Sequence, residues 1–254
     1  MKKLLITGCS YAYGHGLELF HSDINGKDWQ GRAQEWESLP QKYKQFVFTN
    51  RWPKLLADKL GLDEYNVSRP GNSNLSSLIF LKNAINKVGL ENIDRIIFQT
   101  SHPMRAGVLP GETERVLTGF ELANYLEKYL NETGWKNLET DQTVLNFINS
   151  EEINLERNKV CIEDLTKMFE DLTEYGIKCH ILEWQPHTES GFSKNLFRLN
   201  LFGTGENVEN WADKNRLKGG HWMEDNGYTM YFWEGHLSLE GNKSLSEEIY
   251  KVII

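Results

Sequence analysis

Two short stretches near the ends of the chain contain residue types that together could carry out nucleophilic catalysis. Ser10 follows the apolar run 3–7, and His236 stands directly before the last amphipathic stretch. A serine hydroxyl becomes a nucleophile only when a base takes its proton, and that base is usually a histidine. Ser10 and His236 are therefore the first hypothesis for a reactive pair, with His15 and His102 as competing bases.

The elements predicted around these residues alternate between strands and helices. Apolar runs predict buried strands, and apolar residues at helical spacing predict helices. The strands are expected at 3–7, 65–67, 95–100 and 177–184, and the helices at 53–60, at 74–88 with Asn74 as its cap, at 153–175 and from 238 onward. Such alternation is typical of an α/β fold with a parallel sheet covered on both faces.

The carboxyl ends of the predicted strands are the expected place for a site, because ligands of open parallel sheets bind beyond these ends. Four turns fall at this edge, namely those after Thr7, Val67 and Thr100 and the one before Ser238. We therefore expect these turns to converge. Ser10 would then lie at a helix N-terminus, where developing negative charge is stabilised.

Two long stretches interrupt the alternation. The 254 residues are predicted to form a single domain, 1–254, with insertions at about 103–149 and 185–228. The first insertion holds one amphipathic helix within polar chain, and the second is expected to be irregular. Trp211 and Trp222 lie in the second insertion, where an aromatic face would suit a sugar ring. Both tryptophans are predicted to contact the substrate.

Charge, cysteine content and hydropathy exclude several classes of protein. The formal net charge of -8 argues against a nucleic-acid-binding surface, which needs a basic stripe. The three cysteines have no paired spacing, so neither a disulfide framework nor a zinc motif is expected. The apolar core before Cys9 is only Leu4 to Ile6, too short for a signal peptide, and no window approaches the ~20 apolar residues of a membrane span. We expect a cytoplasmic protein that does not act at a membrane.

The first turn does not match a cofactor-binding fingerprint. Its glycines do not form G-x-G-x-x-G, no G-K-[ST] follows, and the histidines lack the H-E-x-x-H spacing of a zinc site. We therefore expect no cofactor and no metal. We also expect Cys9 to be a small buried residue, because a side chain adjacent to Ser10 should point away from it.

Three blocks of the sequence resemble the SGNH/GDSL hydrolases in the order typical of that family. They are Gly8-Cys9-Ser10, Pro70-Gly71-Asn72-Ser73-Asn74 and Glu234-Gly235-His236-Leu237-Ser238. The likeness is closest to short bacteriophage and bacterial members that read G-C-S-Y. The resemblance implies a flavodoxin-like three-layer α/β/α fold. It also implies Ser10 as nucleophile, His236 as general base, and the backbone N–H groups of Ser10 and Gly71 as oxyanion donors.

One departure from the family pattern concerns the oxyanion hole. The block after the third strand normally carries an asparagine that donates to the oxyanion, and this sequence has none there. Thr100 or Ser101 would have to take that role, with Gln99 as a further option. Asn74, His102 and Arg105 are predicted to contact the substrate, and the guanidinium of Arg105 would hold an anionic or polar group.

A second departure concerns the acid that orients the histidine. The family carries an aspartate three residues before it, and this sequence has Trp233 there. Glu234 is the nearest carboxylate and is predicted to be the catalytic acid, reaching the imidazole through a shifted backbone or a sharp turn at Gly235. The alternatives are Asp225 or a backbone carbonyl.

The resemblance implies cleavage of a small acyl ester through an acyl-serine intermediate. The expected substrate is a small-molecule or glycan ester, such as an O-acetyl group on a carbohydrate. If a sugar hydroxyl replaced water, the same pair would make an O-acyltransferase. The third alternative is a non-catalytic scaffold that binds a carbohydrate or a partner, because the oxyanion asparagine and the aspartate are both missing.

Overall fold

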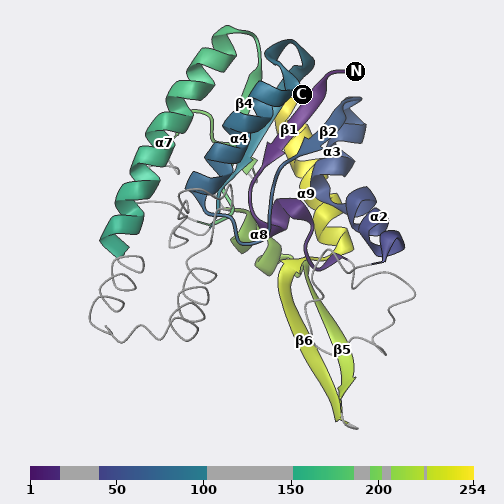
Figure 1. Ribbon diagram of the computed structural model, residues 1–254. Coiled ribbons are helices and arrows are strands. Elements are labelled where there is room, and N and C mark those ends of the chain that lie inside the picture. Colours follow the sequence, from purple (N-terminus) through teal and green to yellow (C-terminus); the bar gives the residue numbers. More distant parts are fainter. Residues whose placement is uncertain (18–39, 102–150, 186–194, 202–206, 226–227) are drawn as a thin grey trace, which may run out of the picture.

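The computed structural model describes residues 1–17, 40–101, 151–185, 195–201, 207–225 and 228–254, with only the backbone described at 151–157 and 219–235. At its centre lies a parallel sheet in the order β2-β1-β3-β4 (Figure 1). Its strands are β1 (Lys3–Thr7), β2 (Asp63–Asn66), β3 (Ile93–Gln99) and β4 (Lys178–Leu182). This is the flavodoxin-like order of a doubly wound sheet. The predicted α/β fold class is therefore confirmed.

Helices cover both faces of the sheet, because side chains of the central strand alternate between two apolar clusters. Leu4 and Ile6 of β1 pack with α3 (Trp52–Leu60) and α9 (Leu239–Ile253). Leu5 packs on the other face with α4 (Asn74–Val88) and α7 (Glu151–Glu174). The two helix layers flank the sheet in Figure 1. None of the helices in the described ranges has the length and apolar character that a bilayer crossing requires.

Helix ends follow the signals in the sequence, with one correction. The left-handed Gly61 ends α3, and Ser238 caps α9 by accepting a hydrogen bond from the Gly241 N–H. The cap of α4 is Ser73, whose hydroxyl accepts from the N–H of Ser76 at 3.1 Å. Asn74 was expected there and is instead the first residue of the helix. Its amide is thereby available for longer-range contacts.

The remaining described helices are short and lie around the sheet. They are α1 (Ser10–Tyr13), α2 (Gln41–Asn50), the 3₁₀ turn η3 (Leu90–Asn92) and α8 (Val208–Lys214). The first predicted insertion, 103–149, lies outside the described residues.

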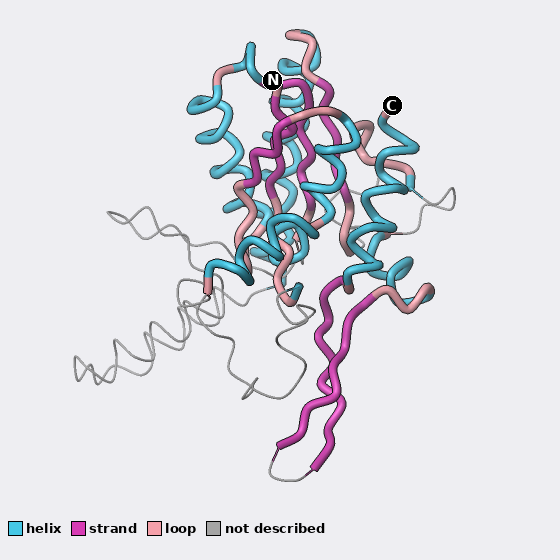
Figure 2. Tube along the Cα trace, turned by 90° about the vertical axis from the view of Figure 1, so that its right-hand side faces the viewer, coloured by secondary structure: helices cyan, strands magenta, loops and turns pink. Residues whose placement is uncertain are grey.

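The second predicted insertion, 185–228, is not the irregular stretch that was expected. It includes α8 and the strand β5 (Lys218–Asp225), which pairs antiparallel with β6 (Tyr228–Leu237). The β5–β6 hairpin projects away from the α/β body in both views (Figures 1 and 2). The sequence does carry a signal for this hairpin, because Asn-Gly at 226–227 stands between two aromatic-rich runs.

Candidate active site

Ser10 stands where β1 gives way to α1, at the carboxyl edge of the sheet. The chain leaves β1 at Thr7, and Ser10 is the first residue of α1. A Cβ on Gly8 would lie 2.8 Å from the Cβ of Gln99, so only glycine lets the turn pass this close to β3. The Ser10 residue is 5% exposed. Its hydroxyl is therefore held in a fixed and largely desolvated position.

His236 approaches Ser10 from the far end of the sequence. Its Nε2 lies 2.9 Å from Oγ of Ser10, within hydrogen-bond distance. The structure thus brings together the two residues that the sequence pattern singled out. The competing base His15 lies beside them, with its ring centroid 5.0 Å from that of His236. The other competitor, His102, lies outside the described residues.

A register shift in the hairpin places His236. Trp233 of β6 pairs with Gly220 of β5, whereas Leu237 pairs with Lys218. Three residues of β6, 234–236, therefore face a single residue of β5. Bulges of this kind bend a strand and re-aim its side chains. The backbone runs through Gly235 as strand, so the sharp turn predicted there is replaced by this bulge.

Aromatic rings that the sequence analysis did not single out pack around the pair. The ring of Tyr11 stacks on that of Trp184, with 3.5 Å between centroids and 18° between planes. The same Tyr11 ring lies 4.7 Å from the imidazole of His236. Trp184 is 1% exposed, so the stack rests on the core. Tyr11 follows Ser10 directly in the G-C-S-Y string, which is the signal that could have marked it.

The turn before Ser10 is fixed by hydrogen bonds from the second sequence block and the residues on either side of it. The carbonyl of Gly8 accepts bonds from the Arg69 N–H (3.3 Å), the Asn72 side chain (3.1 Å) and the Ser77 hydroxyl (3.4 Å). Gly71 lies in this turn with a φ of 79°, a left-handed conformation that favours glycine. The loop that carries the predicted oxyanion donor Gly71 is thus tied directly to the loop that carries Ser10.

The two hydroxyls predicted to replace the oxyanion asparagine are both buried, and they differ in their partners. Ser101 donates its hydroxyl proton to the carbonyl of Asn72 at 2.5 Å, so that proton already takes part in a hydrogen bond within the protein. The hydroxyl of Thr100 accepts from the N–H of Trp184 at 3.1 Å, a bond that does not use its own proton. Of the two, Thr100 is the one whose hydrogen bond leaves its hydroxyl proton to donate.

Asn74, the first residue of α4, links this helix to α7 and to the residues that follow β3. Its Oδ1 accepts from the N–H of Ser101 at 2.7 Å, and its Nδ2 donates to Oδ1 of Asn158 in α7 at 2.7 Å. The residue is 2% exposed. Asn74 was predicted to contact the substrate, but the structure places it beneath the site, where it joins α4, α7 and the end of β3.

Cys9 lies in the core, as predicted. It is 1% exposed, and its sulfur accepts a hydrogen bond from the Gln99 amide at 3.3 Å. Its side chain therefore packs inward against β3, while Ser10 meets His236.

The other predicted site residues are placed only in part. Trp211 lies in α8, half-buried, and packs against the core cluster that contains Leu4 and Ile6. Trp222 lies in β5, and Glu234 in the bulged part of β6, but only their backbones are described. Arg105 lies outside the described residues. Within the described part of the chain, no group of three or more His, Cys, Asp or Glu side chains could hold a metal ion.

Comparisons with known proteins give similar structures but no similar sequences. No protein-family model matches the chain, and no curated protein matches it. A protein assigned to the lipolytic G-D-S-L family, from Desulfitobacterium hafniense DCB-2, is 13% identical, with 99% of each chain covered and a TM-score of 0.43. The psychrotrophic esterase EstA from Pseudoalteromonas sp., in a structure inhibited by monoethylphosphonate, is 13% identical, with 100% of this chain and 97% of that chain covered and a TM-score of 0.46.

A third similar structure is a carbohydrate esterase family 2 enzyme with its carbohydrate binding domain, from Corynascus thermopiles (Myceliophthora fergusii). It is 12% identical, with 99% of this chain and 65% of that chain covered and a TM-score of 0.40.

The fold and site of the present chain define an α/β protein of flavodoxin-like strand order. A serine–histidine pair stands at the carboxyl edge of its sheet.

Proposed function

We propose that this chain is a serine ester hydrolase of the SGNH/GDSL type, in which Ser10 is the nucleophile and His236 the general base. The observation that carries the proposal is the 2.9 Å distance between Oγ of Ser10 and Nε2 of His236. The resemblance of the three sequence blocks to this family supports it, because two of those blocks supply the pair. In the proposal, residues 1–254 form one catalytic domain.

The first half of the reaction forms an acyl-enzyme. The Ser10 hydroxyl donates its hydrogen bond to Nε2 of His236, which takes the proton as Oγ attacks the ester carbonyl carbon. The carbonyl oxygen becomes a tetrahedral oxyanion. When the oxyanion collapses, the bond to the leaving alcohol breaks and His236 returns the proton to that alcohol. The acyl group is then bonded to Ser10.

The second half releases the acyl group to water. His236 takes a proton from the water as its oxygen attacks the acyl carbon, and it returns that proton to Oγ of Ser10 as the acid leaves. The backbone N–H groups of Ser10 and Gly71, with the hydroxyl of Thr100, are the proposed donors to the oxyanion in both halves. Donors fixed in advance are effective because they need no reorganisation during the reaction. The hydrogen bonds to Gly8 supply that rigidity.

The proposed substrate is a small acyl ester, with an O-acetyl group on a carbohydrate as the first choice. The support is the pattern of tryptophans beyond the sheet, Trp211 in α8 and Trp222 in β5. An aromatic face pairs with the apolar face of a sugar ring and leaves the hydroxyls of the sugar in water. Glu234, two residues before His236 in the bulge, is the proposed acid that orients the imidazole.

The test is hydrolysis of p-nitrophenyl acetate by the wild type, Ser10→Ala and Cys9→Ala. In serine hydrolases, loss of the nucleophile costs about 10⁴-fold or more in turnover. We expect Ser10→Ala to show this loss and Cys9→Ala to keep most of the activity. Unchanged hydrolysis by Ser10→Ala, or a large loss confined to Cys9→Ala, would refute the proposal.

A further inference from the structure

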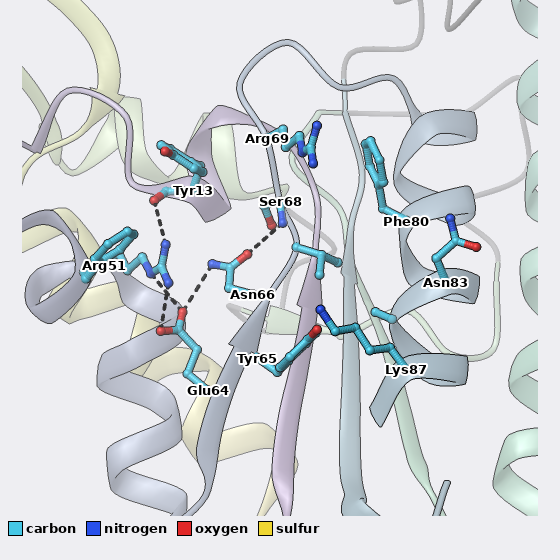
Figure 3. Close-up of a pocket in the computed structure, with 13 residues that line it drawn as sticks. Tyr13, Arg51, Glu64, Tyr65, Asn66, Ser68, Arg69, Phe80, Asn83 and Lys87 are labelled. Atoms are coloured by element: carbon cyan, nitrogen blue, oxygen red, sulfur yellow. Dashed lines mark hydrogen bonds and ion pairs between the residues drawn. The ribbon is translucent and has the colours of Figure 1, made fainter. Parts of the chain in front are cut away.

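A cavity of about 610 Å³ lies along β2, the edge strand of the described sheet. Its lining comes from β2 and the loop that follows it, from one face of α4, and from the ends of α1 and α2 (Figure 3). Neither Ser10 nor His236 belongs to this lining. The cavity is therefore separate from the Ser–His pair, and the proposed ester chemistry makes no use of it.

One buried ion pair in the cavity wall is internally balanced. Nε of Arg51 lies 2.9 Å from a carboxylate oxygen of Glu64, and the two side chains are 10% and 8% exposed. Arg51 also donates to the backbone carbonyl of Tyr13 at 3.3 Å. These two opposite charges neutralise each other, and they hold the end of α2 against β2.

Two further cations in the lining leave the cavity with an excess of positive charge. They are Arg69, in the loop after β2, and Lys87, in the last turn of α4. Within the described ranges neither of them forms an ion pair with a carboxylate. The chain as a whole has the opposite balance, with a formal net charge of -8. A hollow with an excess of one sign of charge concentrates ligands of the other sign.

The geometry of Arg69 suits the capture of an anion. Its guanidinium lies over the ring of Phe80, 4.6 Å from the ring centroid. A guanidinium held over a ring can still make the bidentate bonds that arginine forms with carboxylates and phosphates. Phe80 and Lys87 lie seven residues apart on one face of α4, so the second cation is two turns further along the same wall.

Aromatic side chains give the cavity its apolar part. Tyr65 of β2 lies near Lys87 in Figure 3, and Phe80 lies near Arg69. Rings in such a wall offer apolar faces to a flat ligand. We propose that the cavity beside β2 is a binding site for a small anionic molecule, with a carboxylate or phosphate group held by Arg69 and Lys87 and a flat ring packed against the aromatic side chains.

The experiment is isothermal titration calorimetry with phenylphosphonate, which carries both features and cannot be hydrolysed as an ester. We expect the wild type and Ser10→Ala to bind it with the same affinity, because Ser10 lies outside the cavity. Arg69→Gln and Lys87→Gln should each weaken binding about tenfold, the usual effect of losing one charge-assisted contact. Both side chains are exposed, so the variants should fold. Benzyl alcohol, the neutral analogue, should not bind.

The matched control is Lys82→Gln, which makes the same change of charge in α4 but outside the cavity, where Lys82 pairs with Asp164. Its affinity for phenylphosphonate should equal that of the wild type. The proposal is overturned if no binding is detected, if Lys82→Gln weakens binding as much as Arg69→Gln, or if Ser10→Ala abolishes binding. In the last case the anion occupies the site of the nucleophile. Equal affinity for inorganic phosphate would contradict the role of the flat ring.

Discussion

The two halves of the Ser10–His236 pair are held in place by different kinds of interaction. On the nucleophile side, the turn before Ser10 is fixed by three hydrogen bonds to one carbonyl and by the buried amide of Asn74 beneath it. On the base side, His236 stands in a strand bulge at the foot of a projecting hairpin, beside the rings of Tyr11 and His15. The nucleophile side is therefore held rigidly by buried hydrogen bonds. On the base side, His236 is positioned by packing against aromatic rings and by the register between β5 and β6.

The largest effect is expected on the base side, from Glu234→Gln. If Glu234 holds the imidazole tautomer and stabilises the imidazolium, kcat for p-nitrophenyl acetate should fall by orders of magnitude while the melting temperature stays nearly constant. The matched control is Glu240→Gln, the same change at an exposed residue in the first turn of α9. A fall of less than about tenfold, ~1.4 kcal/mol, would reject Glu234 and make Asp225→Asn the next variant to measure.

On the nucleophile side, the substitution Asn74→Ala should lower the stability of the folded chain. Asn74→Ala removes the acceptor of the Ser101 N–H and the amide that donates to Oδ1 of Asn158. Loss of one partner of a buried hydrogen bond costs about 1–3 kcal/mol, so we expect a loss of roughly 2–4 kcal/mol in the free energy of unfolding, measured by urea denaturation. Asn86→Ala, at an exposed position of the same helix, is the control and should change stability little. Equal stability of the two variants would contradict the framework described for Asn74.

A smaller effect is expected from the two tryptophans, and it should differ between them. Trp222→Ala should raise KM for an acetylated glycan about tenfold, with p-nitrophenyl acetate turnover largely kept, because loops and extensions beyond strand ends carry specificity. Trp211→Ala should raise KM as well, and should also lower the melting temperature, because Trp211 packs against the core. If both variants lost the two activities equally, together with stability, the tryptophans would be structural rather than part of a substrate surface.

A further effect, on stability, is expected away from both halves, at His180 of β4. Burial, with the nearby charges of Arg95 and Lys178, lowers the pKa of His180 from 6.5 to about 4. Between these values the unfolded chain binds a proton that the folded chain does not, so stability falls as the pH drops from about 6.5 toward 4. The loss should be at most about 3 kcal/mol. In His180→Gln the dependence of urea midpoint on pH should flatten over this range, and an unchanged slope would contradict the assignment.

Much of the fold could be predicted because buried parallel strands are continuous apolar runs. The strands at 3–7 and 93–99 carry this signal, and the glycine after α3 marks the end of that helix. The sequence pattern does not predict the hairpin although its Asn-Gly dipeptide is present, because aromatic residues are typical of ligand-binding surfaces as well as of strands.

Of the candidate site, only the residues that stand in recognisable sequence motifs could be predicted. Ser10 and His236 stand in recognisable blocks, and the structure places them 2.9 Å apart. The bulge at 234–236 depends on the register between two strands, which a single sequence does not encode locally. The role of Asn74 depends on Asn158, which lies 84 residues away in the chain, and the stack of Tyr11 on Trp184 joins α1 to the end of β4. Such contacts arise from tertiary packing, so local patterns do not reveal them.

The central claim is that Ser10 is an activated nucleophile, and reaction with a fluorophosphonate tests it most directly, whatever the natural substrate. The account predicts a single adduct on the peptide that contains Ser10, absent from Ser10→Ala and formed far more slowly by His236→Ala, because the base that takes the hydroxyl proton is then missing. An adduct that persists in Ser10→Ala, one that moves to Cys9, or no adduct on the folded wild type would contradict it.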